Sequence, residues 1–255
     1  MLAFKLIGDM VEAFLFILRF NLHNIVMRKP VFVENAVYHI FNRGVDKRTV
    51  FMDDRDYLRF LHQLYELNDE DAVVNLNYYF NPKTMAVESR PVQKAIKLRK
   101  RLVDILVFTL MPNHYHLMLR QKAENGITKF MQKLGTGYTM YFNKKNKRTG
   151  SLFQGRFKAV HLTNNEHLIY LPHYIHTNPL SLNYGGSTSI DFLEKYRWSS
   201  FLDYVGVDNF SSITERQYLL EIFGGESMYR LHTENYLREF SKEDIASKLE
   251  GAMPK

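Results

Sequence analysis

The stretch LMPNHYHLMLR, residues 110–120, places two histidines inside an apolar run. Short apolar runs next to turn residues such as Pro112–Asn113 are typical of buried β-strands. Side chains alternate along a strand, so His114 and His116 are expected on one face and Tyr115 on the other. Two imidazoles on one face can bind the same metal ion. Hydrogen-bonded core histidines are the alternative, because a chain of this composition contains a His-x-His by chance roughly 0.4 times.

Alternation and helical spacing around this stretch predict an α+β domain. Further strands are expected at about 36–42, 103–111 and within 150–162. Helices are expected at 53–69, 89–102, 125–145 and 163–179. The order predicts a ferredoxin-like antiparallel sheet with helices packed mainly on one face and a helical appendage from about Trp198 onward. Helix 163–178 should cross the face that carries the histidines.

Glycine and proline mark special positions in two of these helices. Gly135 and Gly137 indicate a break or a close backbone approach within helix 125–145. Pro172 is expected to kink helix 163–179, because proline lacks the backbone N–H that an interior helical position donates.

Composition limits the class of protein. The chain has 255 residues, 45% hydrophobic and 24% charged, as in ordinary soluble domains. It has no cysteine, which excludes disulfides, a thiol nucleophile and a thiolate metal site, and which agrees with a cytoplasmic protein. Charged residues interrupt the apolar N-terminus, so no membrane span is expected there.

Positive charge is concentrated in the middle of the chain. The net charge is +7, and residues 121–158 contain nine Lys or Arg against one acidic residue, Glu124. Residues 202–255 contain six basic and ten acidic residues. The middle is therefore expected to bind a polyanion such as nucleic acid, and the C-terminal part is not; a merely solvated basic face is the alternative.

The segment HYIHTNP, residues 173–179, supplies a second set of polar groups. Tyr174 and Asn178 are four residues apart and share one face of the expected helix. A phenol and an amide on that face could both approach an ion bound by the two histidines. Imidazole nitrogen with amide and phosphate oxygens suits Mg²⁺ or Mn²⁺, with water completing an octahedron.

Five motifs together resemble one family. They are FNRG at 41–44, MPNHYHLML at 111–119, GSLFQGRFKA at 150–159, YIHTNPL at 174–180 and WSSF at 198–201. In this order they are similar to those of single-tyrosine HUH transposases, in particular the REP-associated tyrosine transposases. The resemblance covers about residues 31–206 and implies the HUH endonuclease fold. Residues 1–30 are then an N-terminal helical extension outside the functional domain, and 207–255 a helical C-terminal extension.

The resemblance also implies roles for individual residues. His114 and His116 match the metal-binding histidines, Asn178 the third metal ligand, and Tyr174 the nucleophile. The family cuts single-stranded DNA at hairpin-associated sites and forms a 5′-phosphotyrosine. Tyr138 and Tyr170 are the next candidates for the nucleophile. Basic residues expected to hold DNA phosphates are Lys144, Lys145, Lys147, Arg148, Arg156 and Lys158.

Several alternatives remain open at this level. Phe153 and Phe157 could stack DNA bases, although alternating phenylalanines in a strand are more often core. His161, His173 and His176 are expected to be structural or solvated. A domesticated relative acting on repeated hairpins, a non-catalytic single-stranded nucleic-acid-binding module and a phosphoesterase that uses water are the rival functions. A homodimer is also left open.

Overall fold

The computed structural model describes residues 31–71, 78–81, 86–89, 99–182 and 190–239. The expected helix in residues 1–30, most of the expected helix at 89–102 and the last residues of the C-terminal extension lie outside this part of the chain.

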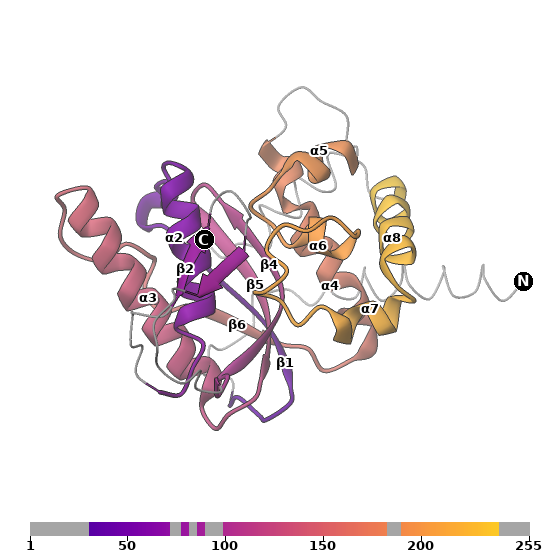
Figure 1. Cartoon of the computed structure of the whole chain (residues 1–255), viewed down its shortest axis with the longest axis horizontal. Helices are drawn as coiled ribbons and strands as arrows, with labels where there is room; N and C mark the ends of the chain where they lie inside the picture. Colours follow the sequence, from indigo (N-terminus) through magenta and orange to yellow (C-terminus); the bar gives the residue numbers. More distant parts are fainter. Residues whose placement is uncertain (1–30, 72–77, 82–85, 90–98, 183–189, 240–255) are drawn as a thin grey trace, which may run out of the picture.

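A four-stranded antiparallel sheet forms the centre of the protein (Figure 1). Its strand order is β4-β5-β1-β6, with β4 at Val103–Met111, β5 at His114–Gln121, β1 at Val37–Arg43 and β6 at Lys158–His161. The histidine strand β5 therefore lies between two neighbours. A separate hairpin joins β2 (Tyr78–Asn81) to β3 (Ala86–Ser89). The predicted α+β class with an antiparallel sheet is confirmed.

Helices α2 (Asp54–Glu66) and α3 (Gly126–Lys145) cover one face of the sheet (Figure 1). The Asp53 side chain caps α2 by accepting a hydrogen bond from the Asp56 N–H at 3.2 Å. Helix α3 runs without a break through both glycines, so of the two alternatives predicted there the break is wrong and the close approach holds at Gly137. A Cβ there would lie 3.1 Å from the Gln63 amide.

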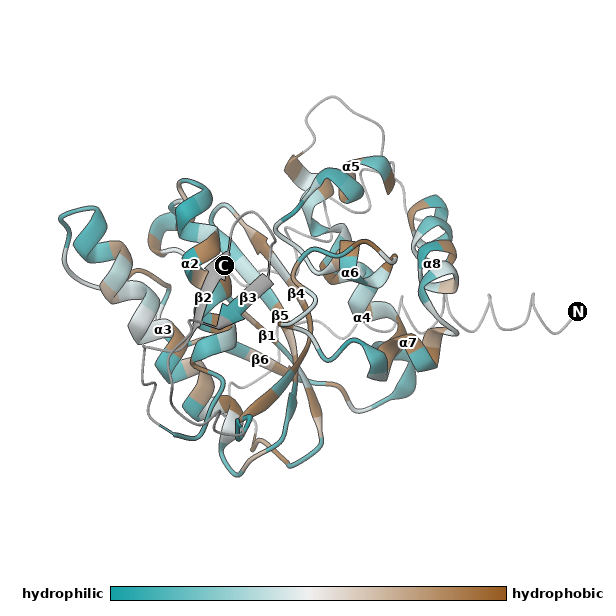
Figure 2. Cartoon of the chain, viewed as in Figure 1, coloured by the Kyte–Doolittle hydropathy of each residue, from teal (hydrophilic) through white to brown (hydrophobic). Residues whose placement is uncertain are grey.

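Alternation along the strands builds the core on this face. The buried members include Tyr38, Ile40, Tyr115, Leu117, Phe60 and Phe130. Figure 2 shows hydrophobic colour along the strands and hydrophilic colour along the outer side of α3. Phe153 is 6% exposed within this core, which rules out the base-stacking role for that ring in this conformation.

The other face of the sheet is covered by α4 (Asn165–Thr177) and the C-terminal helices. These are α5 (Ile190–Lys195), α6 (Phe201–Tyr204), α7 (Gln217–Phe223) and α8 (Glu226–Glu239), and a 3-10 turn at Asn178–Leu182 follows α4. A second hydrophobic cluster joins Val107 and Met118 of the sheet to Ile175 and Tyr229 of the helices. The appendage thus completes a second helical layer, so helices cover both faces. Helix α4 continues through Pro172 to Thr177 as one element.

The WSSF motif closes the outer edge of β4. The Leu110 N–H donates to the Trp198 carbonyl at 2.9 Å, and the Ser200 N–H donates to the Phe108 carbonyl at 3.0 Å. These bonds occupy edge groups that would otherwise be available to another strand.

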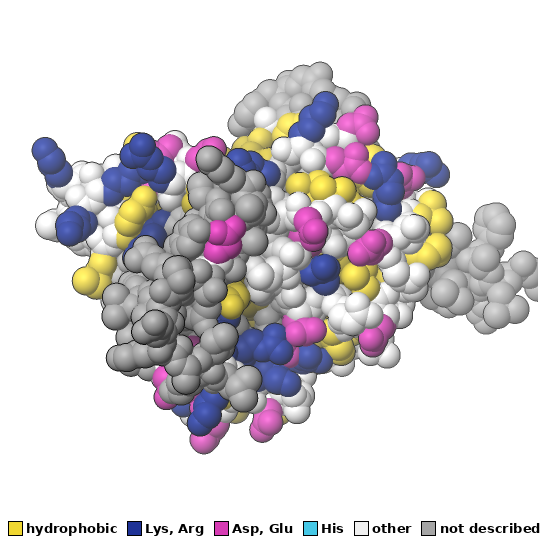
Figure 3. All heavy atoms as spheres, in the orientation of Figure 1, with side chains coloured by type: hydrophobic (Ala, Val, Ile, Leu, Met, Phe, Trp, Pro, Cys, Tyr) yellow, Lys and Arg dark blue, Asp and Glu magenta, His cyan; other side chains and the backbone are white. Residues whose placement is uncertain are grey.

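Charge differs between the two helical layers. Figure 3 shows Lys and Arg side chains over the outer end of α3, at the upper left, and acidic and basic side chains interspersed over the C-terminal helices. Within the described ranges, no helix has the length and apolar character needed to cross a bilayer.

Candidate metal and nucleophile site

The two histidines of β5 lie on the face of the sheet that α4 covers, here called the histidine face. His114 is 7% exposed and His116 is 2% exposed, whereas Tyr115 packs into the core on the opposite face. The predicted alternation is therefore confirmed. The two imidazole ring centroids are 5.1 Å apart, with the planes at 85°.

Each histidine uses its Nδ1 in a hydrogen bond within the protein. His114 Nδ1 lies 2.6 Å from Asn113 Oδ1, and His116 Nδ1 lies 2.8 Å from His39 Nε2. The Asn113 amide is oriented by its own Nδ2, which donates to the Lys47 carbonyl at 3.3 Å. Since Asn113 Oδ1 can only accept, His114 carries its proton on Nδ1 and leaves a lone pair on Nε2.

The Nε2 atoms of His114 and His116 are both buried and have no hydrogen-bond partner. A buried polar atom without a partner costs about 1–3 kcal/mol, so a group bound at these two atoms would stabilise the protein. Burial lowers the pKa of His114 to about 3, with the Arg43 charge acting in the same direction. Burial also holds the pKa of His116 well below its usual value. Both rings are neutral and suited to bind a cation.

The third component comes from α4 and the turn after it. Asn164 caps the helix by accepting a hydrogen bond from the His167 N–H at 2.8 Å. One helical turn separates Tyr174 from Asn178, whose Nδ2 donates to the Tyr174 carbonyl at 2.8 Å. This bond leaves Asn178 Oδ1 as the amide atom that can face an ion. The Asn178 side chain also influences the pKa of His114, which places it beside that ring.

Tyr174 is partly exposed and faces the histidines. Its ring stands at 90° to the His116 ring with the centroids 5.9 Å apart. Burial raises the pKa of Tyr174 to about 12, and a side-chain hydrogen bond with Asn178 opposes that shift. The phenol is therefore protonated at neutral pH unless a positive charge is near it. The fold thus places Tyr174, Asn178, His114 and His116 next to one another on the histidine face.

Other tyrosines considered from the sequence lie elsewhere. The Tyr138 hydroxyl donates to the Val50 carbonyl at 2.6 Å, inside the core on the far side of the sheet. Tyr170 packs against Tyr236 in the second hydrophobic cluster. Of these three tyrosines, Tyr174 is the one whose ring stands against His116. The fold therefore associates Tyr174 with the two site histidines.

The opposite side of α4 is fastened to the C-terminal layer by two histidines. His176 Nδ1 lies 2.6 Å from the Tyr229 hydroxyl, and its Nε2 lies 2.8 Å from Ser200 Oγ. His173 Nδ1 lies 2.9 Å from Thr233 Oγ1. Both histidines are buried, as expected of structural residues. They fix the helix that presents Tyr174 on its other side.

Three of the motifs meet at one corner beside His114. The Gly44 N–H donates to the Asn113 carbonyl at 2.9 Å, and the Gln154 N–H donates to the Arg43 carbonyl at 2.8 Å. Gly44 cannot carry a side chain, because a Cβ would lie 2.4 Å from the Arg48 carbonyl oxygen. FNRG and GSLFQG therefore support the turn that begins the histidine strand.

The basic residues predicted to hold DNA occupy different settings. Lys144, Lys147 and Arg156 are exposed. Lys145 forms ion pairs with Asp53 and Asp56 at 2.9 and 2.6 Å, and Arg148 donates to the Ser151 carbonyl at 2.9 Å. Lys158 pairs with Phe41 across β6 and β1, which puts its side chain on the histidine face. The ammonium of Lys145 is thus engaged in ion pairs within the protein, unlike those of Lys144 and Lys147 among the described residues.

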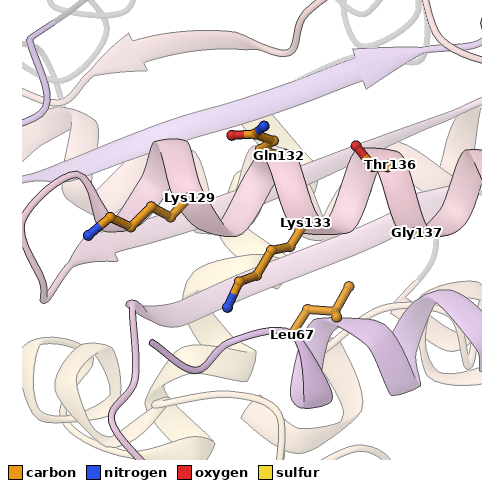
Figure 4. A pocket seen from close by; sticks show the side chains of 6 residues that line it. All are labelled: Leu67, Lys129, Gln132, Lys133, Thr136 and Gly137. Carbon is orange, nitrogen blue, oxygen red and sulfur yellow. The ribbon is translucent and has the colours of Figure 1, made fainter. Parts of the chain in front are cut away.

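A shallow hollow on the other side of the protein is unrelated to these groups. It lies between the end of α2 and the first half of α3, lined by Leu67, Lys129, Gln132, Lys133, Thr136 and Gly137 (Figure 4). The Lys133 ammonium donates to the Asp69 carbonyl at its rim.

Sequence reasoning missed two residues of the site, His39 and Asn113. Each contacts the Nδ1 of a site histidine. The sequence indicates Asn113 only as a turn residue and His39 only as one histidine of an alternating strand. The alternation of β1 places His39 and Phe41 on the face opposite to Tyr38 and Ile40. Because β1 neighbours β5, that alternation is the signal by which His39 could have been assigned to the site. Among the described residues, no group of three or more His, Cys, Asp or Glu side chains is placed to hold a metal ion.

Comparison with known proteins supports the same region. Residues 77–178 match the family model described as "Transposase IS200 like". No curated protein matches the chain. A solved structure of a REP-associated tyrosine transposase bound to a REP hairpin is similar at 12% identity, with a TM-score of 0.46, over 68% of this chain and 81% of that one. Residues 77–178, which are similar to IS200-like transposases, contain His114, His116, Tyr174 and Asn178.

Proposed function

We propose that the protein is a metal-dependent single-tyrosine transposase that cuts and rejoins single-stranded DNA at hairpin-associated sites through a 5′-phosphotyrosine. The observation that carries the proposal is the placement of Tyr174. Its ring stands against His116, whose Nε2 is buried without a partner, and Asn178 lies one turn along the same helix.

The donor set fits a divalent cation of the Mg²⁺ or Mn²⁺ kind. His114 and His116 would hold it through their Nε2 atoms and Asn178 through Oδ1, with water and a phosphate oxygen in the remaining positions. Such an ion would supply positive charge that polarises the scissile phosphate and favours the phenolate. Two neutral imidazoles and one amide leave that charge uncompensated for the DNA phosphate.

The chain's own residues then perform one transesterification. Free tyrosine has a pKa near 10, so ionising it at pH 7.5 costs roughly 3.4 kcal/mol, and the burial that raises the pKa of Tyr174 to about 12 adds to that cost. Tyr174 Oη attacks the phosphorus, its proton passes to solvent, the Oη–P bond forms and the P–O3′ bond breaks. The 3′ oxygen leaves as a hydroxyl with a proton from solvent. The energy of the phosphodiester is kept in the tyrosine ester, so a 3′-hydroxyl can reverse the step and rejoin DNA.

Basic side chains on both sides of the sheet support binding of the DNA backbone. Lys144 and Lys147 lie at the end of α3, Arg156 follows the corner beside Arg43, and Lys158 reaches the histidine face next to Phe41. Phosphate contacts of this kind supply most of the affinity of a single-strand binder.

The organisation we propose is a nuclease domain at 31–206 with extensions at 1–30 and 207–255, acting in the cytoplasm on single-stranded DNA that carries hairpins. The absence of cysteine agrees with that compartment. The described part of the C-terminal extension packs on α4, which supports a role in holding the nucleophile helix.

Trapping a covalent adduct tests the proposal. The protein is incubated with Mn²⁺ and a hairpin oligonucleotide library labelled on the 3′ side of the cut, then denatured, digested and examined by mass spectrometry. We expect labelled DNA on the peptide that contains Tyr174. A water-using phosphoesterase would cut without leaving an adduct, and a binding module would do neither. Either result would overturn the tyrosine mechanism.

A further inference from the structure

We infer that His39 is a positioning residue of the candidate metal site, and that its Nε2 accepts the Nδ1 proton of His116 and so turns the His116 Nε2 lone pair toward the metal ion. The inference rests on the proposed function, since it assigns to His39 a task at the same centre. The observation behind it is the 2.8 Å contact between His39 Nε2 and His116 Nδ1.

The geometry of the two rings suits an in-plane hydrogen bond. Their planes are 19° apart and their centroids are 5.1 Å apart. Nearly parallel rings that touch nitrogen to nitrogen at that separation lie edge to edge. The lone pair of one imidazole lies in its ring plane, so this arrangement directs it at the N–H of the other.

One proton is shared by this contact, and its position decides whether His116 can bind metal. If His39 donates, His116 must carry its own proton on Nε2, which is buried and has no acceptor. If His116 donates, its Nε2 is a lone pair that a cation can satisfy. The second arrangement avoids a buried unmatched donor once metal is bound.

His114 provides an internal comparison. Its Nδ1 faces Asn113 Oδ1, an atom that can only accept, so its tautomer is fixed. His39 therefore has the same relation to His116 as Asn113 has to His114. The two site histidines are held by one outer partner each, as is usual for metal-binding imidazoles.

The strands explain why His39 can reach His116. His116 lies directly across from Phe41, and His39 is the next residue on the same face of β1. Phe41 packs beside both rings, at 4.9 Å from His39 and 5.7 Å from His116. The pair is thus held by a neighbouring strand and a neighbouring aromatic ring, both of which limit rotation of the imidazoles.

Two variants separate the acceptor role from simple packing. His39→Leu fills the space but cannot accept a hydrogen bond, whereas His39→Gln can present an amide oxygen near the position of Nε2. His161→Gln serves as a matched control, because His161 is an exposed histidine of the edge strand β6 stacked on Tyr38 on the opposite face. Thermal unfolding is measured for each variant.

Mn²⁺ binding is measured from the electron paramagnetic resonance signal of free Mn²⁺. The protonated nitrogen of each histidine is identified by two-bond ¹H–¹⁵N NMR of ¹⁵N-histidine-labelled protein without metal. We expect His39→Leu to weaken Mn²⁺ binding by about tenfold to a hundredfold. His39→Gln should stay within about threefold of the parent protein, and His161→Gln should equal it. The NMR spectra should show His116 protonated on Nδ1 in the parent protein and shifted toward Nε2 protonation in His39→Leu.

Different results overturn different statements. Parent-like Mn²⁺ binding by folded His39→Leu, with His116→Ala unable to bind, would reject the role of His39 and leave the proposed function intact. Equal weakening by His39→Leu and His39→Gln, both folded, would reject the acceptor role. Failure of the parent protein to bind Mn²⁺, or parent-like binding by His116→Ala, would reject the metal site and this inference with it.

Discussion

The ring of Tyr174 stands perpendicular to the ring of His116, with their centroids 5.9 Å apart. Tyr174 on α4 and His116 on β5 are 58 residues apart in the chain, and the fold brings the phenol and the buried imidazole into contact. The imidazole nitrogen at that place has no partner, and in the proposed mechanism it is there that a cation and a phosphate would meet the phenol.

Removing the phenol oxygen should stop the chemistry and spare the fold. We expect Tyr174→Phe to lose cleavage of hairpin single-stranded DNA and adduct formation, with binding within a factor of a few, because only the nucleophilic atom is removed. Gel-based cleavage and fluorescence anisotropy measure the two effects. Tyr170→Phe, from the same helix, is the control and should cut normally. Adduct formation by Tyr174→Phe would show that another tyrosine reacts.

Removing one imidazole should abolish metal-dependent cleavage. We expect His116→Ala to show no DNA cleavage in a titration with Mg²⁺ or Mn²⁺ up to roughly 10 mM, the concentration range in which weak metal sites fill. The sheet should remain folded, because the site is built on strands that pair independently of it. Full activity of this variant in the presence of a chelator would show that His114 and His116 are ordinary core histidines.

The amide should be less critical than the imidazoles. Asn178→Ala is expected to raise the Mn²⁺ concentration needed for half-maximal cleavage, because water can replace one oxygen ligand. It also removes the bond to the Tyr174 carbonyl. Asn178→Gln should retain measurable cleavage, since it keeps an amide oxygen. Identical metal titrations for Asn178→Ala and the parent protein would remove this residue from the site.

The basic residues at the end of α3 should divide into two kinds. Neutralising Lys144 and Lys147 should weaken single-strand binding, with the log–log salt slope falling by about 0.7 for each DNA phosphate that the variant no longer neutralises. Lys195→Ala, on an exposed position of α5, is the control. An unchanged slope in the double variant would mean that these two lysines form a solvated face.

Lys145 should act on stability more than on DNA binding. Its ammonium pairs with Asp56, which is fully buried and otherwise accepts from the Met52 N–H and the Tyr141 hydroxyl. Lys145→Ala is expected to lower the free energy of unfolding by about 1–3 kcal/mol in urea titration, because it removes a partner from a buried carboxylate. A stability equal to that of the parent protein would contradict this assignment.

The C-terminal layer should influence catalysis without touching DNA. Tyr229→Phe removes the hydroxyl that meets His176 Nδ1 inside the protein. We expect a decrease of about 1–3 kcal/mol in unfolding free energy and slower cleavage at temperatures where the variant remains folded. Tyr218→Phe keeps its ring on Arg120 and should match the parent protein in both assays. Unaltered cleavage by Tyr229→Phe would show that the contact of α8 with α4 does not influence catalysis.

Local patterns predicted most of the elements that carry the site. Alternation located β1, apolar runs located β4 and β5, and helical spacing located α2, because these signals depend on residues close in sequence. The shared face of His114 and His116 followed from the two-residue period of a strand. Tyr174 and Asn178 followed from the four-residue spacing of a helix.

Contacts between distant segments could not be predicted in the same way. The pairing of His39 with His116 depends on which strands are neighbours and in what register. The ion pair of Lys145 with Asp56 joins residues 89 positions apart, so charges counted along the sequence cannot distinguish that lysine from its free neighbours. The unbroken course of α3 through Gly135 and Gly137 reflects packing against α2, which outweighs the helix propensity of glycine.

The register between β1 and β5 restricts how this chain can vary in length. Arg43 lies across from His114, and Phe41 lies across from His116. Deleting one residue inside β5 or β1 would turn the side chains on one side of the deletion to the opposite face, so His114, His116 and His39 could no longer share the face that α4 covers. Deleting two would restore the face but move them by about 7 Å along the sheet. Insertions and deletions in functional relatives should therefore fall in the connections and be absent from these two strands.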